Sequence, residues 1–205
     1  MADFIVSSSN EAATQLVQSW PDWPGHVVAL VGPPASGKSH LARAWAADVG
    51  AVILGPEDEF SGLAPGASVL IESVENGDWN ESNLFHLFNW IKEISGSLLI
   101  TSRLPPNRWQ IALPDLKSRL ATVAVGEIAQ PDDNLLMILM VKLFSDRQLQ
   151  VNAAVINYIV PRVERSFSAV TRLVDQLDKA ALANKGKVTR NLAKMCLLDD
   201  QNREL

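Results

Sequence analysis

The residues most able to carry chemistry form one short stretch, Gly32-Pro33-Pro34-Ala35-Ser36-Gly37-Lys38-Ser39. This G-x-x-x-x-G-K-S pattern follows an apolar run at 27–31 and leads into a helix-like run, the context in which a phosphate-binding loop works. Glycine lets the backbone bend so that successive N–H groups face a phosphate, and the following helix adds its positive N-terminal end. The stretch predicts binding of a nucleoside di- or triphosphate, whereas a plain Gly/Pro turn before an amphipathic helix is the weaker interpretation.

Within this loop, Lys38 is expected to reach the β- and γ-phosphates, and Ser39 is expected to hold Mg²⁺. The full set of loop residues expected to bind nucleotide is Pro33, Pro34, Ala35, Ser36, Gly37, Lys38, Ser39 and His40.

A second apolar run, 69–71, ends in Glu72 and Ser73. Glu72 stands where a carboxylate that orders the magnesium shell belongs. Ser73 takes the next position, where many ATPases place the carboxylate that polarises water, and a hydroxyl cannot act as that base near neutral pH. Glu75 could partly compensate, or could be an ordinary solvated loop carboxylate. The sequence therefore predicts weak intrinsic ATP hydrolysis at most.

Two further features could act on a nucleotide. The strand-like run that starts at Ser97 ends in Thr101 and Ser102, either of which could sense a γ-phosphate or position water, or could be an ordinary strand-end residue. Arg119 lies in a short helical segment, 113–120. It is either a surface salt-bridge residue or an arginine finger presented in trans, a group that accelerates hydrolysis by about 10³–10⁵-fold.

The elements that must position these residues alternate. Strand-like runs at 27–31, 51–54, 69–71, 97–101 and 122–125 are separated by helical patterns at 10–20, 38–49 and 81–94, the first of them capped by Asn10. This alternation predicts a parallel sheet covered on both faces. From Pro131 the pattern becomes helical, with runs at 135–144, 152–160, 166–183 and, capped by Thr189, up to 198. We expect an α/β domain over 1–130 and a small all-α domain without strands over 131–205.

Composition narrows the class of protein. The 205 residues are 47% hydrophobic and carry a net charge of −5, which argues against a protein that mainly binds nucleic acid. The acidic excess lies before Pro131.

The single cysteine, Cys196, excludes an intramolecular disulfide and is expected to be a small buried residue of the last helix. No apolar run reaches the roughly 18 residues of a membrane span, so a cytoplasmic location is expected. Trp20 and Trp23, in a stretch without Lys or Arg, are expected to pack rather than stack on bases.

An ordered set of segments resembles the AAA+ module of the bacterial replication initiator DnaA. The resemblance is closer to the shortened Hda family, the regulatory inactivators of DnaA, in their alphaproteobacterial form. It covers nearly the whole chain and rests on segments 3–7, 9–13, 20–24, 38–42, 84–89, 99–102, 105–106, 113–116, 118–120, 131–133, 142–144, 146–148 and 177–180.

This resemblance implies a P-loop AAA+ core over 1–130 followed by a helical lid over 131–205. Hda-like proteins bind ADP or ATP, associate with the DNA-loaded sliding clamp and promote hydrolysis of the ATP bound to DnaA, which prevents re-initiation. Arg119 matches the family's arginine finger, and Lys38 and Ser39 match its phosphate and magnesium ligands. Phe4, Ile5 and Asn10 fall in the segment that borders the adenine.

Three departures bear on partners and ligands. The Gln-led apolar clamp-binding peptide of Hda proteins does not precede Asp3, so clamp association is an open expectation. The lid arginine that senses nucleotide aligns with Ser168, and Arg165, one helical turn earlier, is the residue expected to take its role. The helix-turn-helix domain of DnaA does not follow residue 205, so little direct DNA binding is expected.

The leading hypothesis is an Hda-like regulator of replication initiation whose partner is DnaA. Whether this regulator acts as a monomer or a homodimer is left open by the sequence. One alternative is a non-catalytic DnaA-like adaptor that recruits partners at the origin. The other is an autonomous AAA+ ATPase such as a helicase loader, which Ser73 disfavours.

Overall fold

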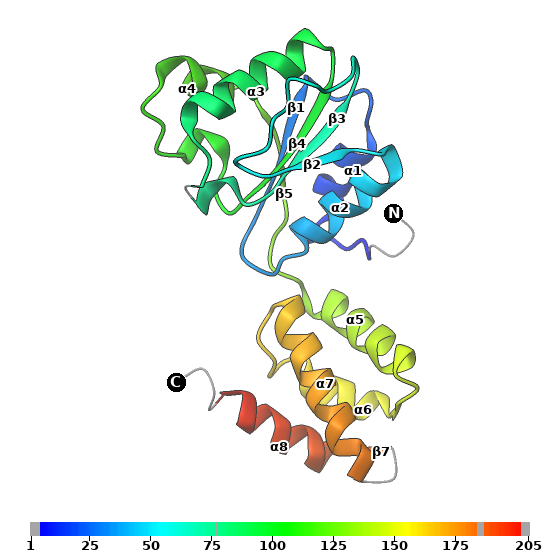
Figure 1. The fold of residues 1–205 in the computed structure, drawn as a ribbon. Coiled ribbons are helices and arrows are strands. Elements are labelled where there is room, and N and C mark those ends of the chain that lie inside the picture. Colours follow the sequence, from blue (N-terminus) through cyan, green and yellow to red (C-terminus); the bar gives the residue numbers. More distant parts are fainter. Residues whose placement is uncertain (1–4, 77, 184–186, 202–205) are drawn as a thin grey trace. The chain divides into compact units, whose positions relative to one another are not determined.

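The structure, a computed structural model, describes residues 5–76, 78–183 and 187–201, and Figure 1 shows its fold. The chain divides into two compact units, residues 1–129 and 130–205.

The first unit contains a five-stranded parallel sheet. Its elements in chain order are α1 (Glu11–Gln18), β1 (Val27–Val31), α2 (Lys38–Val49), β2 (Val52–Leu54), β3 (Ser68–Ile71), the 3₁₀ helix η1 (Val74–Asn76), α3 (Glu81–Glu93), β4 (Ser97–Ser102), the 3₁₀ helix η2 (Pro106–Arg108), α4 (Pro114–Leu120) and β5 (Ala124–Glu127). The strand order is β2-β3-β4-β1-β5, and every neighbouring pair is parallel. The predicted α/β class is confirmed, with boundaries shifted by a residue or two.

Helices cover both faces of this sheet, as Figure 1 shows. Val28 and Leu30 of β1 belong to an apolar cluster with α1 and α2. Ala29 and Val31 point the other way, into a cluster with α3 and α4. Both faces of β1 are then buried, which is why this strand is apolar throughout instead of alternating.

The packing interpretation of the tryptophan-rich turn is confirmed. Trp23 is buried and stacks on Trp45 of α2, with ring centroids 5.2 Å apart. Trp20 donates its indole N–H to Ser97 Oγ at 3.1 Å. The turn thereby joins α2 to the amino end of β4.

The predicted position of Asn10 at the start of α1 is confirmed. Asn10 is the N-cap residue, but its side chain makes no hydrogen bond into the helix. Instead its amide faces backwards: Nδ2 donates to the Ile5 carbonyl at 3.0 Å and Oδ1 accepts from the Ser7 N–H at 2.9 Å. The buried Asn10 therefore fixes the segment that precedes the helix.

The second unit is helical. Its elements are α5 (Asp133–Asp146), β6 (Gln150–Val151), α6 (Ala153–Ile159), α7 (Phe167–Ala183), β7 (Lys187–Val188) and α8 (Arg190–Gln201). Asp132 and Asn152 cap α5 and α6 by accepting from backbone N–H groups, and Thr189 does so for α8 at 3.3 Å. The expectation of a domain without strands is wrong in one detail, because β6 and β7 form a two-stranded parallel ladder. Strands of two residues are too short to leave a periodic pattern in the sequence.

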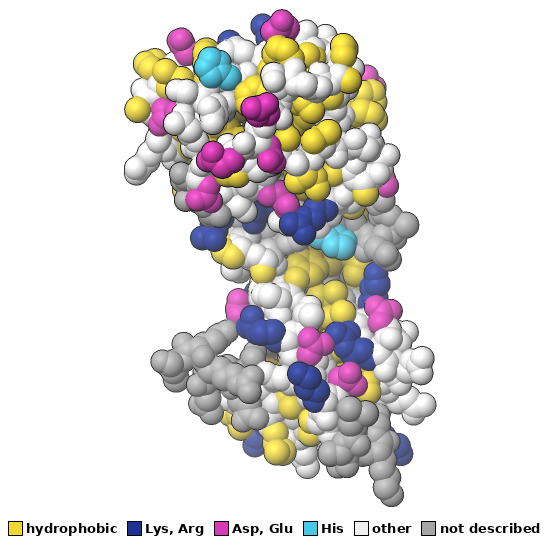
Figure 2. Space-filling model, in the orientation of Figure 1, with side chains coloured by type: hydrophobic (Ala, Val, Ile, Leu, Met, Phe, Trp, Pro, Cys, Tyr) yellow, Lys and Arg dark blue, Asp and Glu magenta, His cyan; other side chains and the backbone are white. Residues whose placement is uncertain are grey.

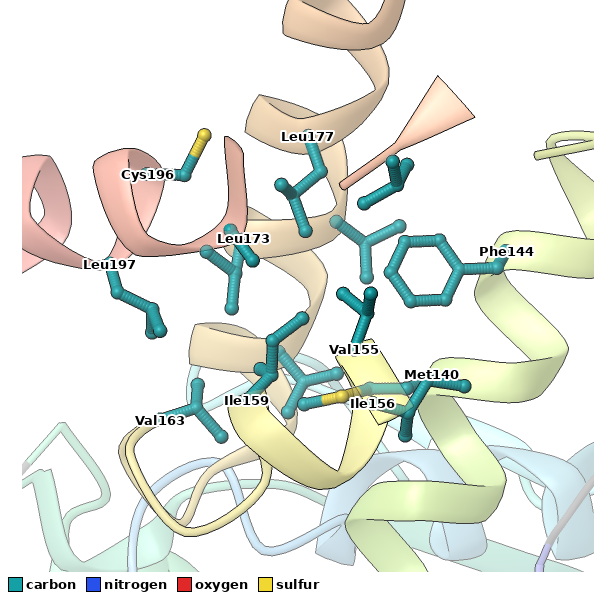
Figure 3. Close-up of a cluster of buried hydrophobic side chains, with 14 of the residues drawn as sticks. Met140, Phe144, Val155, Ile156, Ile159, Val163, Leu173, Leu177, Cys196 and Leu197 are labelled. Carbon is teal, nitrogen blue, oxygen red and sulfur yellow. The ribbon is translucent and has the colours of Figure 1, made fainter. Parts of the chain in front are cut away.

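The second unit has its own apolar core, drawn in Figure 3. Met140 and Phe144 reach into it from α5, Ile159 from α6, and Leu173 from α7. Cys196 of α8 is buried at its edge, as expected of a small apolar residue.

On the face drawn in Figure 2, several acidic side chains lie near one another on the first unit. On the second unit, basic and acidic side chains are interspersed, and the described residues on this face make no continuous basic stripe. None of the described helices combines the length and hydropathy that crossing a bilayer requires.

The core of the second unit can be tested by truncation. Leu173→Ala, at a side chain with 0% exposure, is expected to lower the free energy of unfolding by about 2–5 kcal/mol, because it removes buried apolar contacts and leaves a cavity. The matched control is Met195→Ala at a side chain with 63% exposure, which is expected to change it by less than about 0.5 kcal/mol. Denaturant titrations followed by circular dichroism measure both, and equal effects would contradict this assignment of the core.

Candidate nucleotide site

The loop between β1 and α2 has positive φ at Ala35 and Gly37. Gly37 has φ 96°, in the left-handed region that glycine adopts without strain, and Ala35 shares a positive φ of 54°. Positive φ at alternate residues turns successive N–H groups toward one side, which forms an anion-binding concavity. The loop then enters α2, where Leu41 N–H donates to the Gly37 carbonyl at 3.0 Å.

The ammonium of Lys38 closes this loop on itself. Nζ donates to the Gly32 carbonyl at 2.8 Å and to the Pro33 carbonyl at 2.7 Å. The loop is thereby held in shape by the side chain that the sequence assigned to the phosphates.

The ammonium of Lys38 is partly buried and lies near one acidic and one basic side chain. Partial burial lowers the pKa of this ammonium below the ordinary value of 10.5; the nearby Glu75 carboxylate opposes this shift, and the Arg103 guanidinium adds to it. A bound polyphosphate would add negative charge beside this ammonium.

The other loop residues differ in exposure. Ser36 is buried, and its Oγ has no hydrogen-bond partner among the described residues. Pro34, Ala35, Ser39 and His40 are exposed, so a ligand can reach them.

The carboxyl ends of β1, β3 and β4 bring three predicted segments to one edge of the sheet. Val31 of β1 is in register with Ser102 of β4, and the Gly32 N–H donates to the Ser102 carbonyl at 3.3 Å. The Thr101 hydroxyl accepts from the Ser73 N–H at 3.0 Å, so it holds the segment after β3. In open parallel sheets this edge is where ligands bind.

The two hydroxyls proposed as catalytic have structural partners. Ser102 Oγ donates to the Leu104 carbonyl at 2.7 Å and accepts from the Trp109 indole N–H at 3.1 Å. Thr101 is buried and engaged with Ser73. Both residues therefore shape the loops at this edge, whatever further part they take in chemistry.

Two arginines that the sequence analysis did not select lie at this edge. Arg43 of α2 pairs with Glu72, the expected magnesium-side carboxylate, at 2.8 Å. Arg103 pairs with Glu75 at 3.3 Å. Arg103 directly follows the strand-end hydroxyls, and Arg43 lies four residues after Ser39 on one helix face, so spacing alone could have pointed to both.

The segment expected to border an adenine lies before α1. Ile5 is half-buried and its carbonyl is held by Asn10. Ser9, in the same segment, accepts from the Ala129 N–H at 2.9 Å. Phe4 lies outside the described residues.

Arg119 lies on α4, away from the loop. Leu116 and Leu120 bury the inner side of this helix against α3 and the sheet, on the face opposite α2. The Glu81 carboxylate accepts from the N–H groups of Ala112 and Leu113, which fixes the start of α4 against α3.

The guanidinium of Arg119 is held by a ring and not by an acid. Its Cζ lies 5.2 Å from the ring centroid of Phe85. Within the described part of the chain, no carboxylate forms an ion pair with it. A cation placed over an aromatic ring is oriented but keeps its charge and its outward N–H groups for another ligand.

In the second unit, Arg165 pairs with Asp133 at 2.8 Å, and both side chains are half-exposed. Ser168, which aligns with the family's sensor arginine, lies 3.2 Å from Ser166, hydroxyl to hydroxyl. The structure thus gives Arg165 a carboxylate partner within its own unit.

Solved structures share this combination of a parallel sheet, a loop after β1 and a helical second unit, which defines the AAA+ fold. Domain III of the replication initiation protein DnaA from Thermotoga maritima matches with a TM-score of 0.78 and 18% identity, over 96% of this chain and 94% of that one. A DnaA bound to AMPPCP and single-stranded DNA matches with a TM-score of 0.69 and 16% identity, over 90% and 67%. A variant of Thermotoga maritima RuvB gives a TM-score of 0.72 and 14% identity, over 91% and 66%.

The second unit narrows the class. The family model described as Hda, lid domain, matches residues 133–197, which run from the start of α5 into α8. The second unit is thus similar to the lid domain of the Hda family, and the chain as a whole has the AAA+ fold that DnaA domain III shows.

The unpaired hydroxyl of Ser36 gives a test of the loop geometry. Ser36→Ala removes a buried polar atom that has no partner, so the nucleotide-free protein is expected to gain about 1 kcal/mol in free energy of unfolding. Ser39→Ala, three residues along at an exposed hydroxyl, is the matched control and is expected to change it by less than about 0.5 kcal/mol. Denaturant titrations measure the free energy of unfolding of both variants, and a loss of stability in Ser36→Ala would contradict the loop as described.

Proposed function

We propose that this protein binds ADP or ATP in the loop between β1 and α2 and offers Arg119 to the ATP held by DnaA, so that hydrolysis there prevents re-initiation of replication. The observation that carries the proposal is the Arg119 guanidinium, fixed over Phe85 with no acidic partner in the described part of the chain. The fold shared with DnaA and the Hda-type lid support the same role.

Nucleotide binding is supported by the loop itself. Backbone N–H groups between Ala35 and Lys38 suit phosphate oxygens, and the partly buried Lys38 supplies a positive charge. The exposed Ser39 hydroxyl would contact a magnesium ion that accompanied the nucleotide. Glu72 does not fit that ion as a free ligand, because Arg43 holds its carboxylate.

Delivery of Arg119 in trans is supported by where α4 lies. The helix packs on the sheet face opposite α2, which is the helix that follows the loop of its own chain. In hydrolysis at the partner, water attacks the γ-phosphorus, the bond to the β-phosphate oxygen breaks, and ADP and phosphate leave. Arg119 would stabilise the negative charge that develops on the γ-phosphoryl oxygens during this step.

The protein's own hydrolysis is proposed to be slow. Ser73 stands where a water-polarising carboxylate would be, and Glu75, two residues further on, is paired with Arg103. DnaA would have to supply the group that activates water. This arrangement suits a regulator that contributes the Arg119 guanidinium to its partner's site and has no carboxylate of its own to activate water.

Lys38→Ala tests the nucleotide site. Losing the ammonium is expected to weaken ADP and ATP binding by about a hundredfold or more, since it removes a charge-assisted contact to phosphate. Lys92→Ala, an exposed lysine on α3, is the control and is expected to bind like wild type. Isothermal titration calorimetry measures both, and unchanged affinity in Lys38→Ala would remove the nucleotide site.

Arg119→Ala tests the finger. Stimulation of hydrolysis of DnaA-bound ATP is expected to fall by at least about 10³-fold, because the transition-state charge loses its partner. ADP affinity is expected to stay within about twofold. Lys117→Ala, two residues earlier on the same helix, is the control with full stimulation expected.

The assay measures phosphate release from preloaded DnaA with and without this protein, and with and without DNA-loaded sliding clamp. Equal stimulation by wild type and Arg119→Ala would exclude the finger. No stimulation by wild type in any arm would favour the non-catalytic adaptor, and rapid phosphate release by this protein alone would favour an autonomous ATPase.

A further inference from the structure

The ion pair between Arg43 and Glu72 lies where a magnesium-binding carboxylate was expected. The Arg43 Nε and Nη2 groups both donate to Glu72 Oε2, at 2.9 Å and 2.8 Å. The other oxygen, Oε1, is buried and has no hydrogen-bond partner among the described residues. The guanidinium therefore holds the carboxylate through one oxygen and meets its negative charge.

Burial separates this pair from an ordinary surface ion pair. The Glu72 side chain is only 17% exposed, whereas Arg43 is 67% exposed and reaches in from α2. In the pair between Arg165 and Asp133, by contrast, both side chains are 52% exposed. A mostly buried carboxylate requires a cation or hydrogen-bond donors, and Arg43 is the residue that provides them here.

The guanidinium also stands beside the expected cation position. Arg43 follows Ser39 by four residues in α2, so both side chains lie on one face of the helix, one turn apart. Glu72 follows β3 at the same edge of the sheet. A divalent cation at the Ser39 hydroxyl would be next to a fixed positive charge, and it would find the carboxylate already neutralised.

The donor set therefore does not fit a magnesium ion held through Glu72. Magnesium takes oxygen ligands in near-ideal octahedral geometry, and a carboxylate is the protein ligand that contributes charge to it. Here one oxygen of Glu72 is bound to Arg43 and the other is enclosed.

We propose that Arg43 is a built-in counter-cation for Glu72, which makes the affinity of this protein for adenine nucleotide nearly independent of Mg²⁺. The inference rests on the nucleotide site proposed above. Lys38 and the loop N–H groups bind the phosphates, while Arg43 removes the repulsion that Glu72 would otherwise exert on them. Arg43 is thus a residue that sets the cation requirement of the site without having to touch the nucleotide.

The test is the affinity for ADP and for ATP, measured by isothermal titration calorimetry in excess magnesium and in excess EDTA. Wild-type affinity is expected to change by less than about threefold between the two conditions. Arg43→Gln frees the Glu72 carboxylate, so nucleotide is expected to bind about tenfold or more weakly in EDTA than in magnesium.

A double variant tests whether the freed Glu72 carboxylate causes this loss. In Arg43→Gln/Glu72→Gln neither charge is present, so nucleotide affinity is again expected to differ little between magnesium and EDTA. Arg162→Gln, which removes an exposed guanidinium from the second unit and leaves the Arg43–Glu72 pair intact, is the matched control with the wild-type ratio. Thermal unfolding of each variant in both buffers gives a second readout of the same ratio.

The wild-type measurement alone can overturn the inference. A wild type that loses about tenfold or more in EDTA excludes Arg43 as a substitute for magnesium, although the nucleotide site stands. An Arg43→Gln variant that remains independent of magnesium also excludes it. No binding by wild type in either buffer would remove the nucleotide site itself, and this inference with it.

Discussion

The backbone of Gly32 passes so close to the end of β5 that an added Cβ would lie 2.2 Å from the Ile128 carbonyl oxygen. On its other side, the Gly32 N–H bonds to Ser102 at the end of β4. Strand β1 is therefore in contact with β4 on one side and with the end of β5 on the other, as far as Gly32, where the loop begins. The rest of the site depends on this close approach, because it fixes where the loop leaves the sheet and hence where α2, with Lys38 and Arg43, starts.

Much of this arrangement follows from local sequence. The apolar runs that became β1, β3 and β4 lack alternation because helices bury both their faces, and the glycines and lysine of the loop are contiguous. What local sequence could not supply is contact between segments far apart in the chain. The pairing of Arg43 with Glu72 requires α2 to lie beside the end of β3, which depends on the strand order and not on either segment alone. The backward-facing amide of Asn10 has the same origin, since its partners precede the helix that it was expected to cap.

The two sites of the proposed function, the nucleotide loop and Arg119 on α4, are held in place by different interactions. At the nucleotide loop, several weak donors converge and each is held by backbone geometry. At α4, one guanidinium carries the role, and it is held by the aromatic ring of Phe85 and by the bonds from Ala112 and Leu113 to Glu81. A residue that must act on another molecule has to be oriented without being neutralised, and a ring satisfies that condition where a carboxylate would not.

The edge strand β2 bears on how readily this protein aggregates at high concentration. Val52 and Ile53 are 42% and 53% exposed on a strand whose outer backbone groups have no neighbouring strand in the described sheet. Such a border invites edge-to-edge association and fibrous aggregates, and natural sheets limit the danger by keeping border strands short. Here the strand stops after Leu54, and Pro56, which has no N–H to offer a stacking partner, follows within two residues. A longer β2 would therefore lower the solubility of the protein before it disturbed the geometry of the loop between β1 and α2.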